Sequence, residues 1–202
     1  MKLPTGLLAL CGLALSGDLP AQQPHEHGVV RLGILVEGDR LDLRLQSPLE
    51  TVAGFETAPR TEKQRQAIRR MAAILRDPQS LFVPTAAAGC IAGAVTLRAD
   101  AIAPELLAAP ALPAAGDSVA VSGAPGTSGA AKGSSGRRTT APAHADLEAG
   151  FAFRCAKPQA LTGLQVKLFD AFPPLRQVDV AIVTPRGDSG ARLSPSRASL
   201  TW

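Results

Sequence analysis

Near the start of the chain, two neighbouring runs alternate apolar and polar residues. Positions 30, 32, 34 and 36 are Val, Leu, Ile and Val, and positions 41, 43 and 45 are all Leu. This alternation is typical of strands that bury one face. Gly38-Asp39 lies between the runs and indicates a two-residue hairpin turn, because glycine tolerates the positive φ that such a turn needs. Pro48 ends the second strand, since proline cannot donate to a ladder.

One later segment has the periodicity of a helix. Thr61 and Gln64 have the spacing of a capping box. Four apolar residues then follow at intervals of three and four, which places them on one side of a helix: Ile68, Met71, Ala72 and Leu75. Asp77-Pro78 ends the segment, because proline interrupts helical hydrogen bonding. The pattern predicts a helix over about 61–76.

Six further segments have the composition and alternation of strands: 89–98, 149–155, 164–168, 178–182, 191–193 and 200–202. They follow one another without helices of similar length between them. This order predicts an α+β fold, with a mostly antiparallel sheet and one main helix (about 61–76) inserted after the first hairpin.

Residues 99–143 differ from the rest of the chain in composition. The segment consists mainly of Ala, Gly, Pro, Ser and Thr, which bury too little apolar area to offset the entropy of ordering. We therefore interpret it as a flexible insertion, with a helical turn within 101–112 left open. The length of the remainder fits a single domain over 22–202 that this insertion interrupts.

The first residues predict a cleavable secretory signal peptide over 1–21. Lys2 supplies a positive charge, residues 7–15 form a short apolar run, and small residues follow. A signal peptide has this order of features, and the run is too short to span a bilayer. Cleavage after Ala21 fits, with Ser16 as the alternative. We expect an exported protein with no membrane insertion of the mature chain.

The chain has three cysteines, and we expect two of them to form a disulfide. Cys11 lies within the signal segment, where a lipoprotein cut is disfavoured because a large residue precedes it. Cys90 and Cys155 remain after cleavage, and a lone pair in an oxidising compartment usually forms a disulfide. Two separate buried thiols are the alternative. A thiolate metal site is disfavoured because no CxxC spacing is present.

Composition and motifs argue against two classes of function. The formal net charge is +4, but the chain has no Tyr and only 3% aromatic residues, so base-stacking platforms for nucleic acid are scarce. Gly187-Asp188-Ser189-Gly190 resembles the nucleophile loop of chymotrypsin-like proteases. A catalytic triad also needs a histidine base with an aspartate partner, and no histidine here has a matching context. We expect neither a nucleic-acid-binding protein nor an enzyme.

The three histidines fall in two short rows that also carry carboxylates. The first row is His25-Glu26-His27, and the second contains His144, Asp146 and Glu148. Residues i and i+2 of an extended chain point the same way, so each row presents ligands to one side. Imidazole and carboxylate groups both bind zinc. The pattern predicts a metal site, with chance clustering near a chain terminus as the alternative.

An ordered series of short motifs resembles a known family. The series is His25-Glu26-His27-Gly28, Ser47-Pro48, Gly54-Phe55-Glu56, Pro59-Arg60-Thr61 with Gln64, Ala88-Gly89-Cys90, His144-Ala145-Asp146, Phe151-Ala152-Phe153-Arg154-Cys155, Leu168-Phe169 with Phe172-Pro173, Thr184-Pro185 and Trp202. It resembles the ZrgA-type periplasmic proteins over residues 25–98 and 144–202. The resemblance implies a periplasmic zinc-binding accessory that helps an ABC-type importer to gather zinc.

The insertion departs from the pattern of this family. Members often carry a long His-rich run there, whereas this insertion has no histidine before His144. We therefore expect only about one zinc ion, bound by His25, His27 and His144. Asp146, Glu148 or water would take the fourth position of a tetrahedral site. The alternative is an envelope interaction module of the same fold that has lost metal binding together with the His-rich insert.

Overall fold

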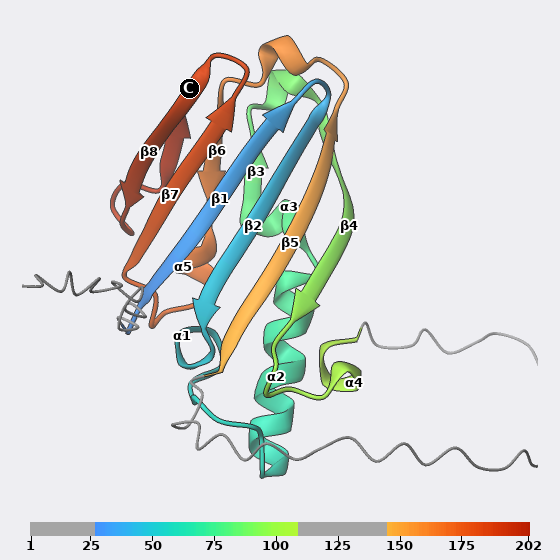
Figure 1. Cartoon of the computed structure of the whole chain (residues 1–202), viewed down its shortest axis with the longest axis vertical. Helices are drawn as coiled ribbons and strands as arrows, with labels where there is room; N and C mark the ends of the chain where they lie inside the picture. Colours follow the sequence, from blue (N-terminus) through green and yellow to red (C-terminus); the bar gives the residue numbers. More distant parts are fainter. Residues whose placement is uncertain (1–26, 109–144) are drawn as a thin grey trace, which may run out of the picture.

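The largest part of the fold is a six-stranded sheet with strand order β4-β5-β2-β1-β7-β8 (Figure 1). The structure is a computed structural model and describes residues 27–108 and 145–202. The strands of this main sheet are β1 Val29–Glu37, β2 Arg40–Pro48, β4 Cys90–Arg98, β5 Asp146–Cys155, β7 Gln177–Thr184 and β8 Gly187–Leu193. The predicted signal peptide lies outside the described residues.

The first two strands form the predicted hairpin. β1 and β2 pair antiparallel, from Arg31 opposite Gln46 to Glu37 opposite Arg40. The turn is therefore the pair Gly38 and Asp39, and Gly38 has the expected positive φ, at 57°. The local signals of alternation and turn chemistry were sufficient to predict both strands and the turn between them.

The main sheet is mixed, which corrects the prediction of a mostly antiparallel sheet. β1 pairs with β7 in parallel, from Val29 opposite Gln177 to Leu35 opposite Val183. The other pairings of this sheet are antiparallel. Alternation of apolar residues shows which face of a strand is buried and carries no information about strand direction. The two partners are also far apart in the chain, so no turn signal indicates their pairing.

A small antiparallel sheet and several helices lie behind the main sheet in the view of Figure 1. The small sheet has the order β3-β6-β9, with β3 Phe82–Pro84, β6 Gly163–Val166 and β9 Ser199–Thr201. The helical elements are α1 Leu49–Ala53, α2 Glu62–Leu75, α3 Pro78–Leu81, α4 Pro104–Leu107 and α5 Leu168–Ala171, with 3-10 turns at Ala86–Ala88 and Pro158–Ala160. The strand predicted over 164–168 ends at Val166, because α5 begins at Leu168.

α2 is the main helix, as predicted. Thr61 is its N-cap, and the capping box with Gln64 is present. The four residues of the predicted apolar stripe are all buried, and they pack into one core with the inner face of the main sheet. The opposite face of the main sheet carries no described helix or strand (Figure 1). No helix among the described residues is long and apolar enough to cross a membrane.

The two cysteines that remain after the predicted cleavage are joined. Cys90, the first residue of β4, forms a disulfide with Cys155, the last residue of β5 and its register partner. The bond ties the edge strand β4 to the sheet. A crosslink that closes a loop of 65 residues stabilises the fold by about 4 kcal/mol in the chain-entropy estimate.

The beginning of the predicted insertion packs against the core. Ile102 and Leu107 are buried, and α4 is the helical turn that the sequence left open within 101–112. The guanidinium of Arg76, the C-cap of α2, donates from Nε and Nη2 to the carbonyl oxygen of Leu107, at 3.1 and 2.7 Å. The packed part of the chain therefore extends to residue 108, and 109–144 lie outside the described residues.

Candidate metal centre

Three of the five predicted metal ligands lie within the described residues. His27 precedes β1, while Asp146 and Glu148 belong to β5. His25 and His144 lie outside the described residues, so their part in a site stays a prediction. The geometry around His27 can be followed atom by atom.

Gly28 fixes the backbone next to His27. Its φ is +77°, and a Cβ at this position would lie 2.8 Å from the carbonyl oxygen of Pro174, so a residue with a side chain is excluded both by conformation and by space. The Gly28 N–H donates to the hydroxyl of Thr51, a buried residue of α1, at 3.3 Å. The glycine of the HxHG motif therefore sets the position at which His27 approaches α1.

Arg176, which directly precedes β7, holds the same segment from the other side. Its guanidinium Nη2 donates to the carbonyl oxygen of His27 at 2.7 Å. The backbone N–H groups of Arg176 and Gln177 both donate to the carbonyl oxygen of Gly28, at 2.8 and 3.0 Å. Four hydrogen bonds thus anchor the His27-Gly28 pair between α1 and the start of β7.

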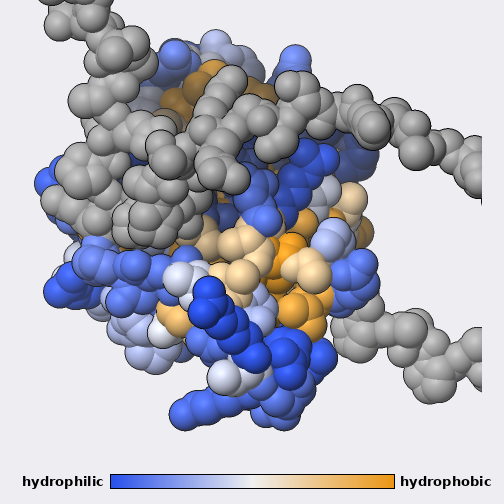
Figure 2. All heavy atoms as spheres, turned by 60° about the horizontal axis from the view of Figure 1, so that its bottom comes forward, coloured by the Kyte–Doolittle hydropathy of each residue, from blue (hydrophilic) through white to orange (hydrophobic). Residues whose placement is uncertain are grey.

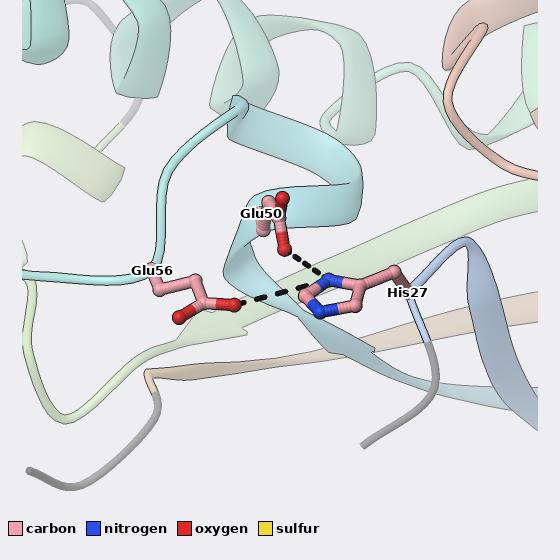
Figure 3. A group of neighbouring side chains, drawn as sticks. All are labelled: His27, Glu50 and Glu56. Carbon is pink, nitrogen blue, oxygen red and sulfur yellow. Dashed lines mark ion pairs between the residues drawn. The ribbon is translucent and has the colours of Figure 1, made fainter.

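Two carboxylates converge on the imidazole of His27. Glu50 reaches it from the first turn of α1, and Glu56 from the loop that follows α1 (Figure 3). His27 Nδ1 contacts Glu50 Oε2 and lies 3.8 Å from Glu56 Oε1. The imidazole is 65% exposed, and the two glutamate side chains are about 40% exposed. One ligand atom from each residue lies within 4.8 Å of the other two.

The spacing of these three atoms fits a zinc ion after small side-chain rotations. A tetrahedral zinc ion with bonds of about 2.0–2.2 Å holds its ligand atoms roughly 3.3–3.6 Å apart. Both glutamates have rotatable side chains and remain partly exposed, so Glu50 is able to move away from the imidazole and Glu56 toward it until this spacing is reached. The donor set, one nitrogen and two carboxylate oxygens, is one that zinc accepts.

Glu50 Oε2 has an unusual environment. This oxygen is buried and accepts no hydrogen bond from the described residues, although it contacts His27 Nδ1. A buried carboxylate oxygen without a hydrogen bond is costly. A cation placed between the lone pairs of Glu50 Oε2 and His27 Nδ1 would satisfy both atoms. This ion pair between Glu50 and His27 makes the cluster a candidate metal site.

The backbone next to the cluster also holds the residue that follows His144. The Ala145 N–H donates to the carbonyl oxygen of Glu56 at 3.2 Å, and the Ala145 carbonyl oxygen accepts from the Leu49 N–H at 2.8 Å. The chain therefore resumes at Ala145 between the two segments that carry the glutamates. His144 is bonded covalently to this anchored residue.

Asp146 and Glu148 lie on a different part of the surface. They are exposed residues of β5, opposite Pro48 and Gln46 of β2, and they line a hollow together with Arg98 and Asp100. They are not members of the group formed by His27 and the two glutamates. Metal binding by these two carboxylates together with His144 stays a prediction.

Glu50 and Glu56 were missed as ligands in the sequence. The signal for Glu50 lies in the hairpin. The observed pairing ends with Arg31 opposite Gln46, and extending it by four residues on each side places position 27 opposite position 50. No comparable signal exists for Glu56, although the motif Gly54-Phe55-Glu56 contains it. The loop that carries it is positioned through contacts with Ala145, which is far away in the sequence.

The end of the molecule at which α1 lies has a mainly hydrophilic surface. Figure 2 views this end, and many of the described atoms that it shows belong to hydrophilic residues, with hydrophobic residues exposed among them. β1 and β5 both start at this end (Figure 1). With His27 65% exposed and the two glutamates about 40% exposed, the cluster is accessible from solvent, as an exchangeable cation site must be.

The fold and the donor set define a β-rich protein with an open surface site suited to a divalent cation such as zinc. The family model described as ZrgA family zinc uptake protein matches residues 24–202. The match covers most of the chain, and the protein belongs to this family. Comparison with curated proteins gives no match.

Proposed function

We propose that the protein binds zinc outside the cytoplasm and supplies it to an uptake system, as an accessory to an ABC-type importer. Membership of a zinc uptake family and the donor set around His27 support this function. The disulfide between Cys90 and Cys155 supports an oxidising compartment, which for an exported bacterial protein is the periplasm.

The proposed zinc ligands are His27 Nδ1, Glu50 Oε2 and Glu56 Oε1. The buried Glu50 oxygen that lacks a hydrogen bond is the observation that carries this assignment. His144 is the proposed fourth ligand, because its neighbour Ala145 is hydrogen-bonded to the backbone of Glu56. His25, two residues before His27, is the alternative for the fourth position.

The proposed stoichiometry is about one zinc ion per chain. The group around His27 is the only set of three or more candidate ligand residues within reach of one ion among residues 27–108 and 145–202. The exposure of His27 supports an exchangeable site, since a zinc site with an open position releases its ion more readily than a closed structural site. Ready release is what delivery to an importer requires.

Calorimetric titration of the metal-stripped protein with zinc tests this proposal. The expected result is one site, weakened at least tenfold by His27→Ala and by Glu50→Gln. His144→Ala should weaken it comparably if His144 is the fourth ligand, and His25→Ala should do so if His25 takes that position. The matched control is Glu37→Gln, which removes a carboxylate at the opposite end of β1, roughly 30 Å along the strand.

Two results would contradict the proposal. Zinc could fail to bind the parent protein, which would favour the envelope interaction module. Alternatively, His27→Ala and Glu50→Gln could bind zinc as well as Glu37→Gln does, which would place zinc elsewhere on the chain.

A further inference from the structure

β8 forms one edge of the main sheet, and no described strand pairs with its outer side (Figure 1). An edge strand presents unpaired N–H and C=O groups, with which a strand of another chain can pair unless the edge is blocked. β8 is seven residues long, contains no proline and pairs with β7 without a register shift. Its free side is therefore able to accept another strand.

The other sheet edges among the described residues are interrupted or short. β4, at the opposite edge of the main sheet, has a register shift between Ala92 and Val95, and such a bulge protects an edge from pairing. In the small sheet, the edge strands β3 and β9 have three residues each, and β3 ends at Pro84. Of these four edges, β8 offers the longest regular one.

The backbone groups of every second residue of β8 point to the free side. Thr184 and Gly187 flank a two-residue turn and are register partners, so they form a hydrogen-bonded pair. Hydrogen-bonded pairs alternate with non-hydrogen-bonded pairs along an antiparallel ladder. The residues that direct their N–H and C=O groups away from β7 are therefore Asp188, Gly190 and Arg192.

β8 is complementary to itself at one antiparallel register. When two copies lie with Gly190 opposite Gly190, Asp188 of each copy lies opposite Arg192 of the other. These are the two charged residues in the sequence of β8, and both are exposed. All three positions direct their backbone groups to the free side, so the same register matches hydrogen bonds as well as charges. Opposite charges that face each other across two strands stabilise the pairing.

Both charged side chains are available to a second copy. The Asp188 side chain makes no hydrogen bond or ion pair within residues 27–108 and 145–202. Arg192 donates from Nε to Asp179 Oδ1 at 3.1 Å, which leaves its two terminal nitrogens for a second carboxylate. The guanidinium has enough donors for both.

One existing contact on the free side would have to be released. The Arg192 carbonyl oxygen accepts from Arg197 Nη2 at 3.4 Å, which is longer than an ordinary N–H···O hydrogen bond. Arg197 is exposed, so its guanidinium can return to water when a backbone N–H of the second copy takes its place.

We propose that β8 pairs antiparallel with β8 of a second copy of this chain, with Gly190 opposite Gly190 on a two-fold axis. The two main sheets then form one continuous sheet, held by about six backbone hydrogen bonds and by two pairs of Asp188 with Arg192. β8 is about 24 Å long at roughly 3.4 Å per residue. A contact along one strand of this length is smaller than a standard interface, so the dimer is weak and reversible.

Sedimentation velocity of the mature protein, from micromolar to millimolar concentration, tests the association. We expect a monomer–dimer equilibrium that is the same with and without a zinc chelator, so its failure would not bear on the metal site. Hydrogen exchange locates the contact. The amides of Asp188, Gly190 and Arg192 should exchange more slowly as the concentration rises, because they gain partners, whereas those of Ser189 and Ala191 already face β7 and should not change.

Charge reversal tests the register. Asp188→Lys and Arg192→Glu each place like charges opposite each other in their own dimers, so each alone should weaken self-association at least tenfold. An equimolar mixture of the two variants should associate again, because each introduced charge then faces an opposite one. Asp170→Lys makes the same charge change at an exposed position of α5 and should dimerise like the parent.

Four results would overturn the proposal. The parent could remain monomeric up to millimolar concentration, or Asp188→Lys could dimerise as well as Asp170→Lys does. The mixture of the two reversed variants could associate no better than either variant alone. Protection from exchange could also rise on β4 and not on β8, which would place the contact at the opposite edge.

Discussion

At the scale of single residues, the position of His27 depends on a guanidinium from a distant part of the chain. Arg176 Nη2 donates to the His27 carbonyl oxygen, and no side chain of the candidate zinc ligands takes part in this bond. Arg176 is therefore a positioning residue, which orients a ligand without contacting the ion itself. Groups that orient metal ligands typically contribute ten- to a hundredfold to metal affinity.

We expect Arg176→Ala to weaken zinc binding roughly tenfold while the protein remains folded. Arg176→Lys should restore part of the affinity, because the ammonium can still donate to the His27 carbonyl oxygen but lacks the planar fork of donors. Calorimetry gives the affinities, and circular dichroism checks the fold. Equal zinc affinity in the parent and in Arg176→Ala would contradict a positioning role.

The sequence contained part of the candidate site. His27 was predicted because two histidines with one residue between them form a recognisable pattern, and the hairpin that brings the start of β1 next to the end of β2 was also predicted. Glu56 could not be predicted, because its loop is positioned by a backbone hydrogen bond to Ala145, which is 89 residues away in the sequence. Ligands on one hairpin are predictable from local register, whereas ligands brought together by tertiary contacts are not.

At the scale of elements, α2 shows which features a sequence specifies well. Its cap and its apolar stripe are local signals, and both are present in the structure. The parallel pairing of β1 with β7 is not local, since nothing in either strand identifies the other as its partner.

The first turn of α2 carries an ion network that the spacing of charges permits: Glu62 accepts from Arg65 Nε at 2.8 Å and from Arg69 Nη1 at 2.9 Å.

This network lowers the pKa of Glu62 below its usual value, mainly through the hydrogen bond from Arg65 and then through that from Arg69. Since the pKa is lower in the folded chain than in the unfolded chain, the network stabilises the fold above the ordinary glutamate pKa. That stabilisation is lost as pH falls through the lowered pKa. The Glu62 side chain is 55% exposed, so the effect on stability should be small.

We expect an NMR titration of the Glu62 carboxyl group to show this lowered pKa directly. Arg65→Ala and Arg69→Ala should each raise the pKa toward the ordinary glutamate value, because each removes a hydrogen-bond donor. Arg70→Ala removes an arginine from the same helix without touching the network and is the control. An unchanged Glu62 pKa in both of the first two variants would contradict the described network.

At the scale of the whole molecule, the segment between β4 and β5 contains the predicted insertion. The disulfide joins the first residue of β4 to the last residue of β5, at the ends of these strands away from the insertion. The sequence predicted that all of 99–143 is dispensable for folding. Burial of Ile102 and Leu107 moves that boundary, because both residues belong to the core.

We therefore expect two linker replacements to behave differently. A short Gly/Ser linker in place of 109–143 should leave the melting temperature within a few degrees of the parent, because the segment is poor in large apolar residues. The same linker in place of 99–143 should lower it by roughly 10 °C, because Ile102, Leu107 and the contact from Arg76 are lost. Equal melting temperatures for the two replacements would show that α4 adds nothing to stability.

The central claim is that zinc binds where α1 meets the start of β1. The most direct test is a crystal structure of the zinc-loaded protein, with anomalous difference maps from data above and below the zinc absorption edge. The account predicts one strong peak per chain, about 2.0–2.2 Å from His27 Nδ1 and from carboxylate oxygens of Glu50 and Glu56. A peak at Asp146 and Glu148 without His27, or no peak in crystals grown with excess zinc, would contradict it.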